Sequence, residues 1–292
     1  MQSRQFAVPA TLAAAGLWQH GRAQRKWDLE QAVHRAVDWR NPESRAMYVY
    51  LGGAFTQASR QAAMPLTKFY QRGSVLSWDY GYSRFDLEGV YADAYSQLRL
   101  RSDTYDKLVV VGGSVGAVNA FRLAREFQRD VETSLLIVDP LLSRNGLPRD
   151  VQIMSALLGY ARPGPVFNAL GQSLIPQLIP GRDPSIWESG TEEAVLSQMK
   201  DMYDIKLSYF LDVARSLPAS APDPSGYVDM RVVGLFSEFE PTLDQDGKAA
   251  DFAHAVQLAE VSAHVVLDAH HLTFVEQDGL WSEWFDIALP LV

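Results

Sequence analysis

The chain has no cysteine, relatively few basic residues and no long apolar run, and each of these features excludes a class of protein. Without cysteine there is neither a disulfide nor a thiolate metal site. The 26 Lys and Arg residues are outnumbered by 35 Asp and Glu residues, and the net charge of −9 argues against a surface that binds nucleic-acid phosphates. No apolar run reaches the roughly 18 residues typical of a membrane span. The sequence therefore predicts a globular protein with no nucleic-acid partner and no membrane span.

Two common kinds of cofactor site are also missing. A nicotinamide site uses GxGxxG after a first strand, with an acidic residue about twenty positions later, and the glycine-rich run at 112–116 does not have this spacing. The sequence also contains no spaced set of His, Asp and Glu ligands, and the adjacent His270 and His271 form a poor chelating pair. We therefore expect no metal ion and no cofactor.

The amino terminus is mildly apolar over residues 6–18 and follows Arg4, as in a weak signal peptide. Pro9 interrupts this segment and the basic region is thin, so we favour an arm or helix packed on the core, and a cytoplasmic protein. The whole chain has 292 residues, of which 47% are hydrophobic. This length fits one large domain with an insertion, or two small domains.

The most informative motif is the GxSxG run from Gly112 to Gly116, with Ser114 at its centre. It follows the apolar run 107–111 and precedes a helical pattern at 117–127. A strand, a GxSxG turn and a helix form the setting of a nucleophile elbow, in which a tight turn exposes the serine hydroxyl at the carboxyl edge of a sheet. Because strand and helix nearly touch there, a side chain at position 112 or 116 is expected to collide with its surroundings.

Apolar strand patterns alternate with helical patterns along most of the chain, which predicts a largely parallel sheet covered on both faces. The expected strands are one or two within 24–39, then 46–51, 74–78, 107–111, 134–138, 231–236 and 263–267, and the expected helices are 58–72, 87–100, 117–127, 251–260 and 280–288. The alternation stops between 141 and 229, where helical patterns, including a long one at 192–217, are mixed with Pro and Gly.

A serine nucleophile needs a base, and the base needs an acid to orient it. In folds with this elbow the chain order is serine, then Asp or Glu, then histidine. Of the six histidines, two precede Ser114, one falls in an expected helix and one in an expected strand, which leaves His270 and His271 after the last strand. We favour His271 as the base and keep His270 as the alternative, because neighbouring side chains usually point apart.

The acid is expected after strand 231–236, and Glu240 is our first choice. The alternatives are Glu238, Asp244 and Asp139, the last because it ends an earlier strand at the same edge of the sheet. Two backbone N–H groups are expected to face the developing oxyanion. We assign them to Val115, which follows the nucleophile, and to Ala54, which follows the glycine pair 52–53 after the strand at 46–51.

On these residues the chain resembles the α/β-hydrolase superfamily over nearly all of residues 24–292. The similar segments are the strand and glycine pair at 48–53, the strand and loop at 75–83, the elbow at 111–117, and the last strand and histidine loop at 265–276. The resemblance implies an α/β-hydrolase fold, with a mostly parallel eight-stranded sheet flanked by helices and a helical lid inserted after the sixth strand. It also places His271 at the position of the catalytic histidine, whereas Glu240 stands where the family more often has aspartate.

The resulting prediction is a core formed by residues 1–140 and 230–292 and a lid formed by 141–229. Apolar lid residues are candidates to line a pocket for an apolar acyl or aromatic group, namely Leu157, Leu158, Tyr160, Phe167, Leu170, Leu174 and Ile175. We therefore expect a serine hydrolase, of the carboxylesterase type, that cleaves an ester of a small or medium apolar substrate through an acyl-enzyme. The alternatives are a thioesterase, an amide or C–C hydrolase with the same triad, and a non-catalytic ligand-binding protein.

Overall fold

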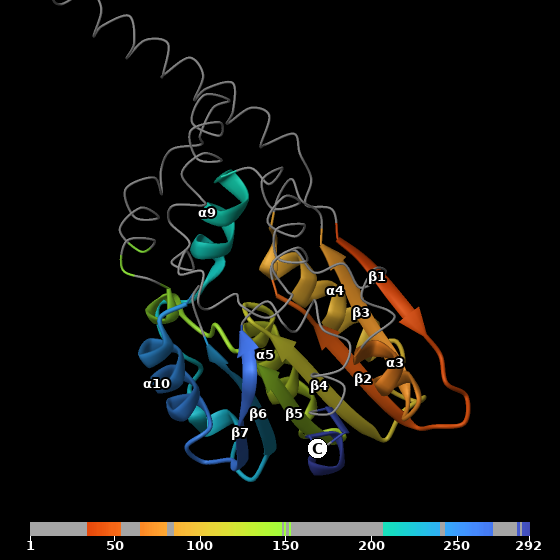
Figure 1. Cartoon of the computed structure of the whole chain (residues 1–292). Coiled ribbons are helices and arrows are strands. Elements are labelled where there is room, and N and C mark those ends of the chain that lie inside the picture. Colours follow the sequence, from red (N-terminus) through yellow and green to blue (C-terminus); the bar gives the residue numbers. More distant parts are fainter. Residues whose placement is uncertain are drawn as a thin grey trace, which may run out of the picture.

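A computed structural model describes residues 34–53, 65–80, 85–147, 149, 152, 207–239, 243–270, 285–286 and 288–292. These residues form one seven-stranded sheet in the order β1-β3-β2-β4-β5-β6-β7 (Figure 1). Only β1 runs antiparallel to its neighbour, and all the other pairs are parallel. The strands are β1 (His34–Trp39), β2 (Ala46–Leu51), β3 (Ser74–Tyr80), β4 (Lys107–Gly113), β5 (Glu132–Val138), β6 (Arg231–Phe239) and β7 (Glu260–His270).

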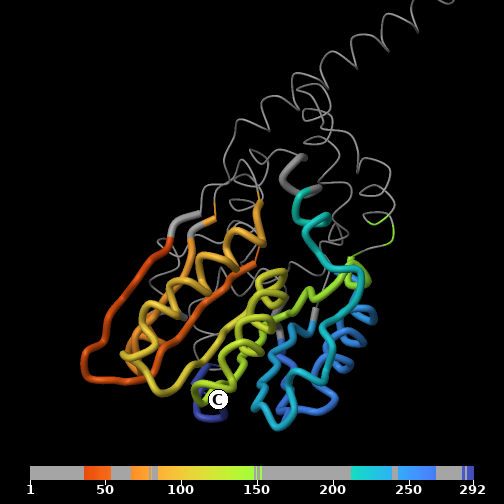
Figure 2. The backbone as a smooth tube through the Cα atoms, turned by 180° about the vertical axis from the view of Figure 1, so that it is seen from behind, coloured from red at the N-terminus to blue at the C-terminus, as the bar shows by residue number. Residues whose placement is uncertain are grey.

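Helices cover both faces of the sheet, as the continuous apolar strands predict. On one face, buried residues of α4 (Leu87–Arg99), α5 (Gly116–Phe127), α9 (Leu207–Ser216) and α10 (Gln245–Ala255) share one core with the sheet. The view from behind shows α4 and α5 in front of the strands (Figure 2). On the other face, Phe69 of α3 (Pro65–Tyr70) stacks on Tyr48 and meets Phe285 edge-on. The central strands are therefore buried on both sides.

The expected α/β architecture is confirmed. Every strand expected from 46 onward is present, and the helices expected at 87–100 and 117–127 are present as α4 and α5. The resemblance implied eight strands, and the described residues form seven. The early-strand prediction at 24–39 is represented by β1, and its residues 24–33 lie outside the described part. Among the described helices, none combines the length and apolarity that crossing a membrane requires.

Several boundaries differ from the prediction, and three of them concern α10, β6 and β7. The helix expected at 251–260 is wrong in extent, because α10 begins at Gln245, where the Asp244 side chain accepts a hydrogen bond from the Gly247 N–H. Strand β6 continues to Phe239, so Glu238 lies within the strand and not after it. Strand β7 continues to His270, which is therefore its last residue and not part of the following loop.

The predicted lid at 141–229 lies largely outside the described residues, including all of its pocket candidates. Its described ends pack on the core. Leu141 and Leu142 after β5 are buried, and so are Val213 and Ala214 of α9. The helix expected at 192–217 is described from Leu207 onward.

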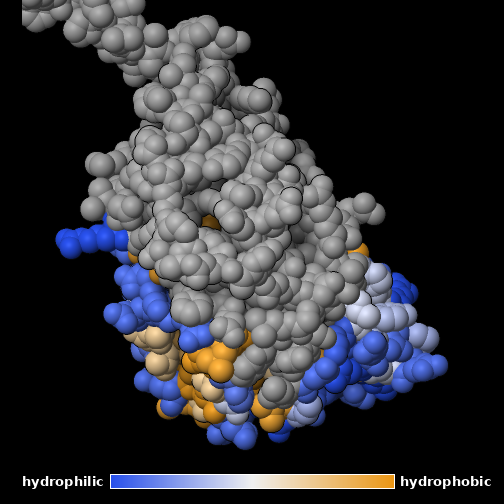
Figure 3. Space-filling model, viewed as in Figure 1, coloured by the Kyte–Doolittle hydropathy of each residue, from blue (hydrophilic) through white to orange (hydrophobic). Residues whose placement is uncertain are grey.

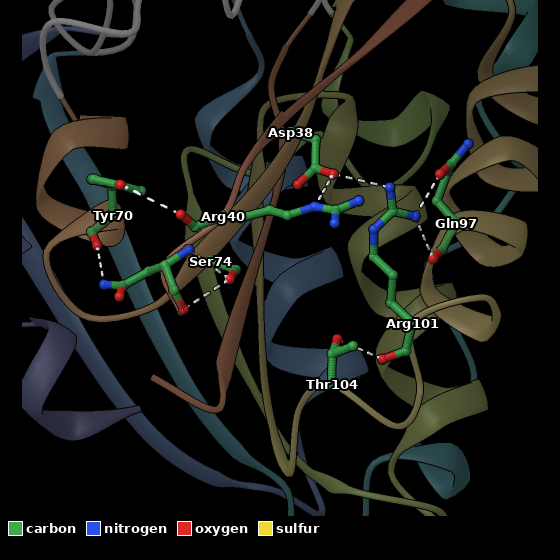
Figure 4. Close-up of polar contacts among 8 residues, drawn as sticks. Asp38, Arg40, Tyr70, Ser74, Gln97, Arg101 and Thr104 are labelled. Atoms are coloured by element: carbon green, nitrogen blue, oxygen red, sulfur yellow. Dashed lines mark hydrogen bonds and ion pairs between the residues drawn. The ribbon is translucent and has the colours of Figure 1, made fainter. Parts of the chain in front are cut away.

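The first strand is held by polar contacts at the amino-terminal end of the parallel strands (Figure 4). Asp38 of β1 accepts hydrogen bonds from Arg101 Nη2 at 3.0 Å and from Arg40 Nε at 3.3 Å. Arg101 also donates through Nη1 to the backbone carbonyl and the side-chain oxygen of Gln97 in α4. These contacts join β1 to the end of α4, at the opposite end of the sheet from Ser114.

Candidate active site

Ser114 lies in a strained turn between the end of β4 and the start of α5. Its φ of 49° is in the left-handed region, which non-glycine residues seldom adopt. Three backbone hydrogen bonds hold it there. The Ser114 N–H donates to the Val138 carbonyl at 2.9 Å, and the Ser114 carbonyl accepts from Leu141 N at 3.0 Å and from Ala117 N at 3.1 Å. Strain that is held in this way is a common property of functional residues.

The two elbow glycines allow the turn because there is no space for a side chain. A Cβ atom on Gly116 would lie 2.2 Å from the carbonyl oxygens of both Leu51 and Gly52. A Cβ atom on Gly112 would lie 2.6 Å from the Ala120 Cβ. Helix α5 therefore starts in direct contact with the end of β2, and the crowding expected from the sequence is present at both positions.

The loop after β2 approaches Ser114 directly. A Cβ atom on Gly53 would lie 3.0 Å from the Ser114 Cβ and 3.6 Å from Oγ, so the backbone of this loop contacts the serine side chain. Among the described residues, the N–H of Val115 meets no hydrogen-bond acceptor. Ala54, the second predicted oxyanion donor, lies outside the described residues. Gly53, the residue before Ala54, therefore lies against the Ser114 side chain.

The carboxyl ends of the central strands meet at the edge where Ser114 lies. Gly112 pairs with Leu51, and Gly113 pairs with Val138 of β5. Phe239 at the end of β6 pairs with His270 at the end of β7. Glu240 and His271 follow these two paired residues in the sequence, and both lie outside the described residues.

Asp139, one alternative acid, has a carboxylate that accepts three hydrogen bonds. It follows β5, has φ 41° and is buried. Its Oδ1 accepts from the Ser237 N–H at 2.8 Å and from Lys248 Nζ at 3.1 Å, and its Oδ2 accepts from the Ser237 hydroxyl. Lys248 is only 1% exposed. The carboxylate of Asp139 therefore connects the ends of β5, β6 and α10.

The other two alternative acids that the structure describes are exposed. Glu238 lies in β6, and Asp244 caps α10 through its hydrogen bond with Gly247 N at 2.9 Å. The Asp244 N–H in turn donates to the Gly146 carbonyl at 2.9 Å. The structure therefore gives Asp244 a local role at the start of a helix.

Sequence reasoning missed a buried polar network beside the elbow. Asp251 of α10 accepts from the Ser143 hydroxyl at 2.5 Å and from Asn145 Nδ2 at 3.3 Å. Together with the ion pair between Lys248 and Asp139, these contacts fix α10 against the segment after β5. Lys248 and Asp251 are three positions apart on one helix, where a lysine and an aspartate ordinarily indicate a solvated face. No local signal marks them as buried.

One ionisable side chain under the site has a strongly shifted pKa. Tyr50 of β2 is completely buried, and this burial raises the pKa of its phenol well above the ordinary value, with a smaller contribution from Tyr80. The Tyr80 hydroxyl donates to the Gly52 carbonyl at 3.3 Å. Tyr50 is therefore a neutral part of the core, and the Tyr80 contact steadies the loop that reaches Ser114.

Comparison with known proteins identifies the fold. No protein-family model matches the chain, and no curated protein sequence matches it. Solved structures do match. An enol-lactonase from Burkholderia xenovorans has a TM-score of 0.62 at 13% identity over 89% of this chain and 97% of its own. A monoacylglycerol lipase from Paleococcus ferrophilus has a TM-score of 0.59 at 15% identity over 89% of this chain and 97% of its own. A carboxylesterase structure from Nitrososphaera gargenis has a TM-score of 0.59 at 9% identity over 89% of this chain and 94% of its own. The chain therefore has the α/β-hydrolase fold.

Proposed function

We propose that this protein is a serine hydrolase that cleaves a carboxylic ester of a small or medium apolar substrate. The observation that carries the proposal is the position of Ser114, in a left-handed turn at the carboxyl edge of the sheet, with the backbone of Gly53 against its side chain. This arrangement suits an exposed nucleophile next to an oxyanion site. The structural neighbours include a carboxylesterase, a lipase and an enol-lactonase, which agrees with ester chemistry.

The proposed reaction has two halves. Ser114 Oγ attacks the carbonyl carbon while His271 takes its proton, and Glu240 orients His271. The N–H groups of Val115 and Ala54 stabilise the negative oxygen of the tetrahedral intermediate. The intermediate collapses to an acyl-enzyme as His271 returns the proton to the departing alcohol. Water then repeats the steps, so that the carboxylic acid leaves and Ser114 is regenerated.

The choice of Glu240 over Asp139 is supported by what surrounds Asp139. Its two carboxylate oxygens already accept three hydrogen bonds from Ser237 and Lys248, which leaves only one acceptor position, on Oδ2, for a histidine. Glu240 follows the strand end that pairs with the residue before His271. Because Glu240 and His271 follow neighbouring strand ends, Glu240 is in the better position to orient His271.

The first test is covalent labelling by a fluorophosphonate, together with hydrolysis of para-nitrophenyl acetate, butyrate and octanoate. We expect the wild type to be labelled and to turn over at least one ester, and Ser114→Ala to lose both, because removing one member of a serine-histidine pair costs orders of magnitude in kcat. His271→Ala is expected to behave like Ser114→Ala, whereas His270→Ala keeps its activity. A wild type that is neither labelled nor active contradicts the proposal and favours a ligand-binding protein.

The acid is identified by a matched panel. Glu240→Gln is expected to reduce kcat by orders of magnitude with little change in thermal stability. Glu238→Gln and Asp244→Asn are exposed controls at neighbouring positions and are expected to remain active. Asp139→Asn is expected to lose stability and to keep turnover per folded molecule. Loss of turnover in a folded Asp139→Asn protein, with an active Glu240→Gln, would reassign the acid.

If the protein is labelled but hydrolyses none of the three esters, Ser114 is still the nucleophile and the substrate belongs to another class. The same triad cleaves thioesters, amides and some C–C bonds, so a panel of acyl thioesters and amides is the next assay. The acyl chain-length profile then measures the size of the acyl pocket.

A further inference from the structure

Strand β7 lies at one edge of the sheet and exposes an unusual surface. It pairs with β6 on one side, and no strand among the described residues pairs with its other side. With 11 residues it is also the longest strand of the described part. An open edge presents a row of backbone N–H and C=O groups, which is a template for pairing with another chain. Natural proteins usually protect such an edge with charged side chains, prolines or a short strand.

The side chains of β7 do the opposite. Every second residue from 261 to 267 is apolar and exposed, and we call this set the β7 stripe, formed by Val261, Ala263, Val265 and Leu267. The exposed fraction is 39% for Val261, 54% for Val265 and 61% for Leu267. Val266, which points to the opposite face, is completely buried. The exposed apolar positions are therefore a property of one face of the strand.

The β7 stripe lies on the same face of the sheet as α10, which packs on the neighbouring strand β6. Val265 is the register partner of Phe236, whose ring packs edge-on against Phe252 of α10. In the space-filling view, apolar surface is visible in the strip between α10 and β7 (Figure 3). Two more exposed apolar residues, Val228 at 52% and Leu258 at 48%, lie near the amino end of the stripe, where Asp229 N donates to the Leu258 carbonyl. The apolar surface thus continues beyond the strand.

The sequence of β7 is complementary to itself in the antiparallel direction. With a two-fold axis at Val265, each odd-numbered residue faces another odd-numbered residue, so the two stripes join into one apolar band. Ala263 then faces Leu267. The register of β7 against β6 is irregular between Val266 and His270, so the regular self-pairing is centred on residues 263–267.

We propose that this protein forms a symmetric dimer through β7, in which the strands of two copies pair antiparallel about Val265 and the two sheets join into one. A second copy of the chain satisfies the open backbone edge and covers the β7 stripe. Closed two-fold symmetry of this kind is the commonest form of soluble oligomer. The proposal does not depend on the chemistry assigned to Ser114.

The absence of cysteine allows a sharp test by disulfide formation, because a single introduced cysteine is the only thiol in the chain. In Val265→Cys the two cysteines face each other across the axis, with Cα atoms about 4.5–5.5 Å apart, within the roughly 4.4–6.8 Å that a disulfide spans. In Val261→Cys, the matched control on the same stripe, the two cysteines are separated by about 27 Å along the strands. We expect mild oxidation to give a covalent dimer of Val265→Cys and only monomer for Val261→Cys.

The non-covalent state is measured by analytical ultracentrifugation of the full chain. We expect the wild type to sediment as a dimer and Val265→Lys to sediment as a monomer, since the change adds a charge at the axis. Leu100→Lys is the control, because Leu100 is 78% exposed at the end of α4, and it is expected to remain a dimer. A monomeric wild type overturns the proposal. So does a dimer that Val265→Lys leaves intact, and so does equal crosslinking of Val261→Cys and Val265→Cys.

Discussion

The buried ion pair between Lys248 and Asp139 gives a prediction whose magnitude follows from the structure. The pair joins two residues that are 109 positions apart in the sequence, and their side chains are only 1% and 3% exposed. In Lys248→Met a side chain of similar length removes the cation and leaves the Asp139 carboxylate buried with only its Ser237 contacts. Breaking one partner of a buried pair typically costs about 3–5 kcal/mol.

This free energy converts to a measurable shift in melting temperature. With an unfolding entropy of about 2.1 cal/mol/K per residue, a chain of 292 residues loses roughly 5–8 °C for a destabilisation of about 3–5 kcal/mol. The double variant Lys248→Met with Asp139→Asn leaves no charge unpaired in this pair. We expect it to lose clearly less than the sum of the two single losses, with a coupling energy of about 2–3 kcal/mol.

The assay is thermal unfolding by calorimetry together with urea unfolding of the four proteins in the cycle. Lys68→Met is the matched control, because Lys68 pairs with Asp286 at the surface, where the side chains are 25% and 49% exposed. Such a pair contributes about 0–1 kcal/mol. If Lys248→Met loses no more stability than Lys68→Met, or if the two changes at 139 and 248 are additive, the reasoning from burial is refuted.

Three further predictions concern the elbow, the start of α10 and alkaline pH. Gly116→Ala places a Cβ atom 2.2 Å from the Leu51 carbonyl oxygen. We therefore expect a free energy of unfolding in urea that is lower by at least about 3 kcal/mol, and the loss of fluorophosphonate labelling. A stable, labelled variant would show that the turn is not crowded. Asp244→Ala removes the cap of α10 and is expected to lower the free energy of unfolding in urea by about 1 kcal/mol. Asp244→Asn keeps the cap, and we expect it to lose less than half of that. Equal losses would exclude a capping role. Burial raises the pKa of Tyr105 and of Tyr227 to about 12. Since the unfolded chain loses these phenol protons first, near pH 10, the free energy of unfolding is expected to fall between about pH 10 and 12. The decrease is up to about 2.7 kcal/mol for each tyrosine. Tyr227→Phe is expected to reduce this slope in urea titrations, and an unchanged slope contradicts the assignment.

The proposed dimer and the proposed reaction use the same strand in different ways. The β7 stripe lies along the strand, whereas the predicted base follows its last residue, His270. Pairing β7 with a second copy adds backbone hydrogen bonds close to the point at which the chain leaves the sheet toward His271. Activity measured together with the oligomeric state would show whether a firmly held strand end matters for turnover.

Much of the fold could be predicted from local patterns. Continuous apolar runs marked the strands from β2 to β7, and apolar residues at helical spacing marked α4, whose first turn is capped by Asp86 accepting from Gly89 N. The turn at Ser114 was also predictable, because two glycines around a serine between a strand and a helix fit only a cramped turn. These features depend on residues close together in the chain, so periodicity and spacing reveal them.

The boundaries that were predicted wrongly depend on distant contacts. Residues 245–250 have almost no apolar periodicity, and α10 begins there because Asp244 caps it and because Lys248 reaches Asp139 across the fold. Strands β6 and β7 extend to Phe239 and His270 because the two strands continue to pair beyond their apolar runs. A strand end is set by its neighbour in the sheet, and this neighbour is not encoded in the local pattern.

The sequence by itself therefore determined which residues are chemically capable, a serine in an elbow, a histidine pair after the last strand and several acids. Only the tertiary structure decided that Gly53 lies against Ser114, and that Asp139 is bound to Lys248 and Ser237. The physical reason is that strand and helix patterns arise from neighbouring residues, whereas the environment of a carboxylate depends on side chains brought together from distant parts of the chain.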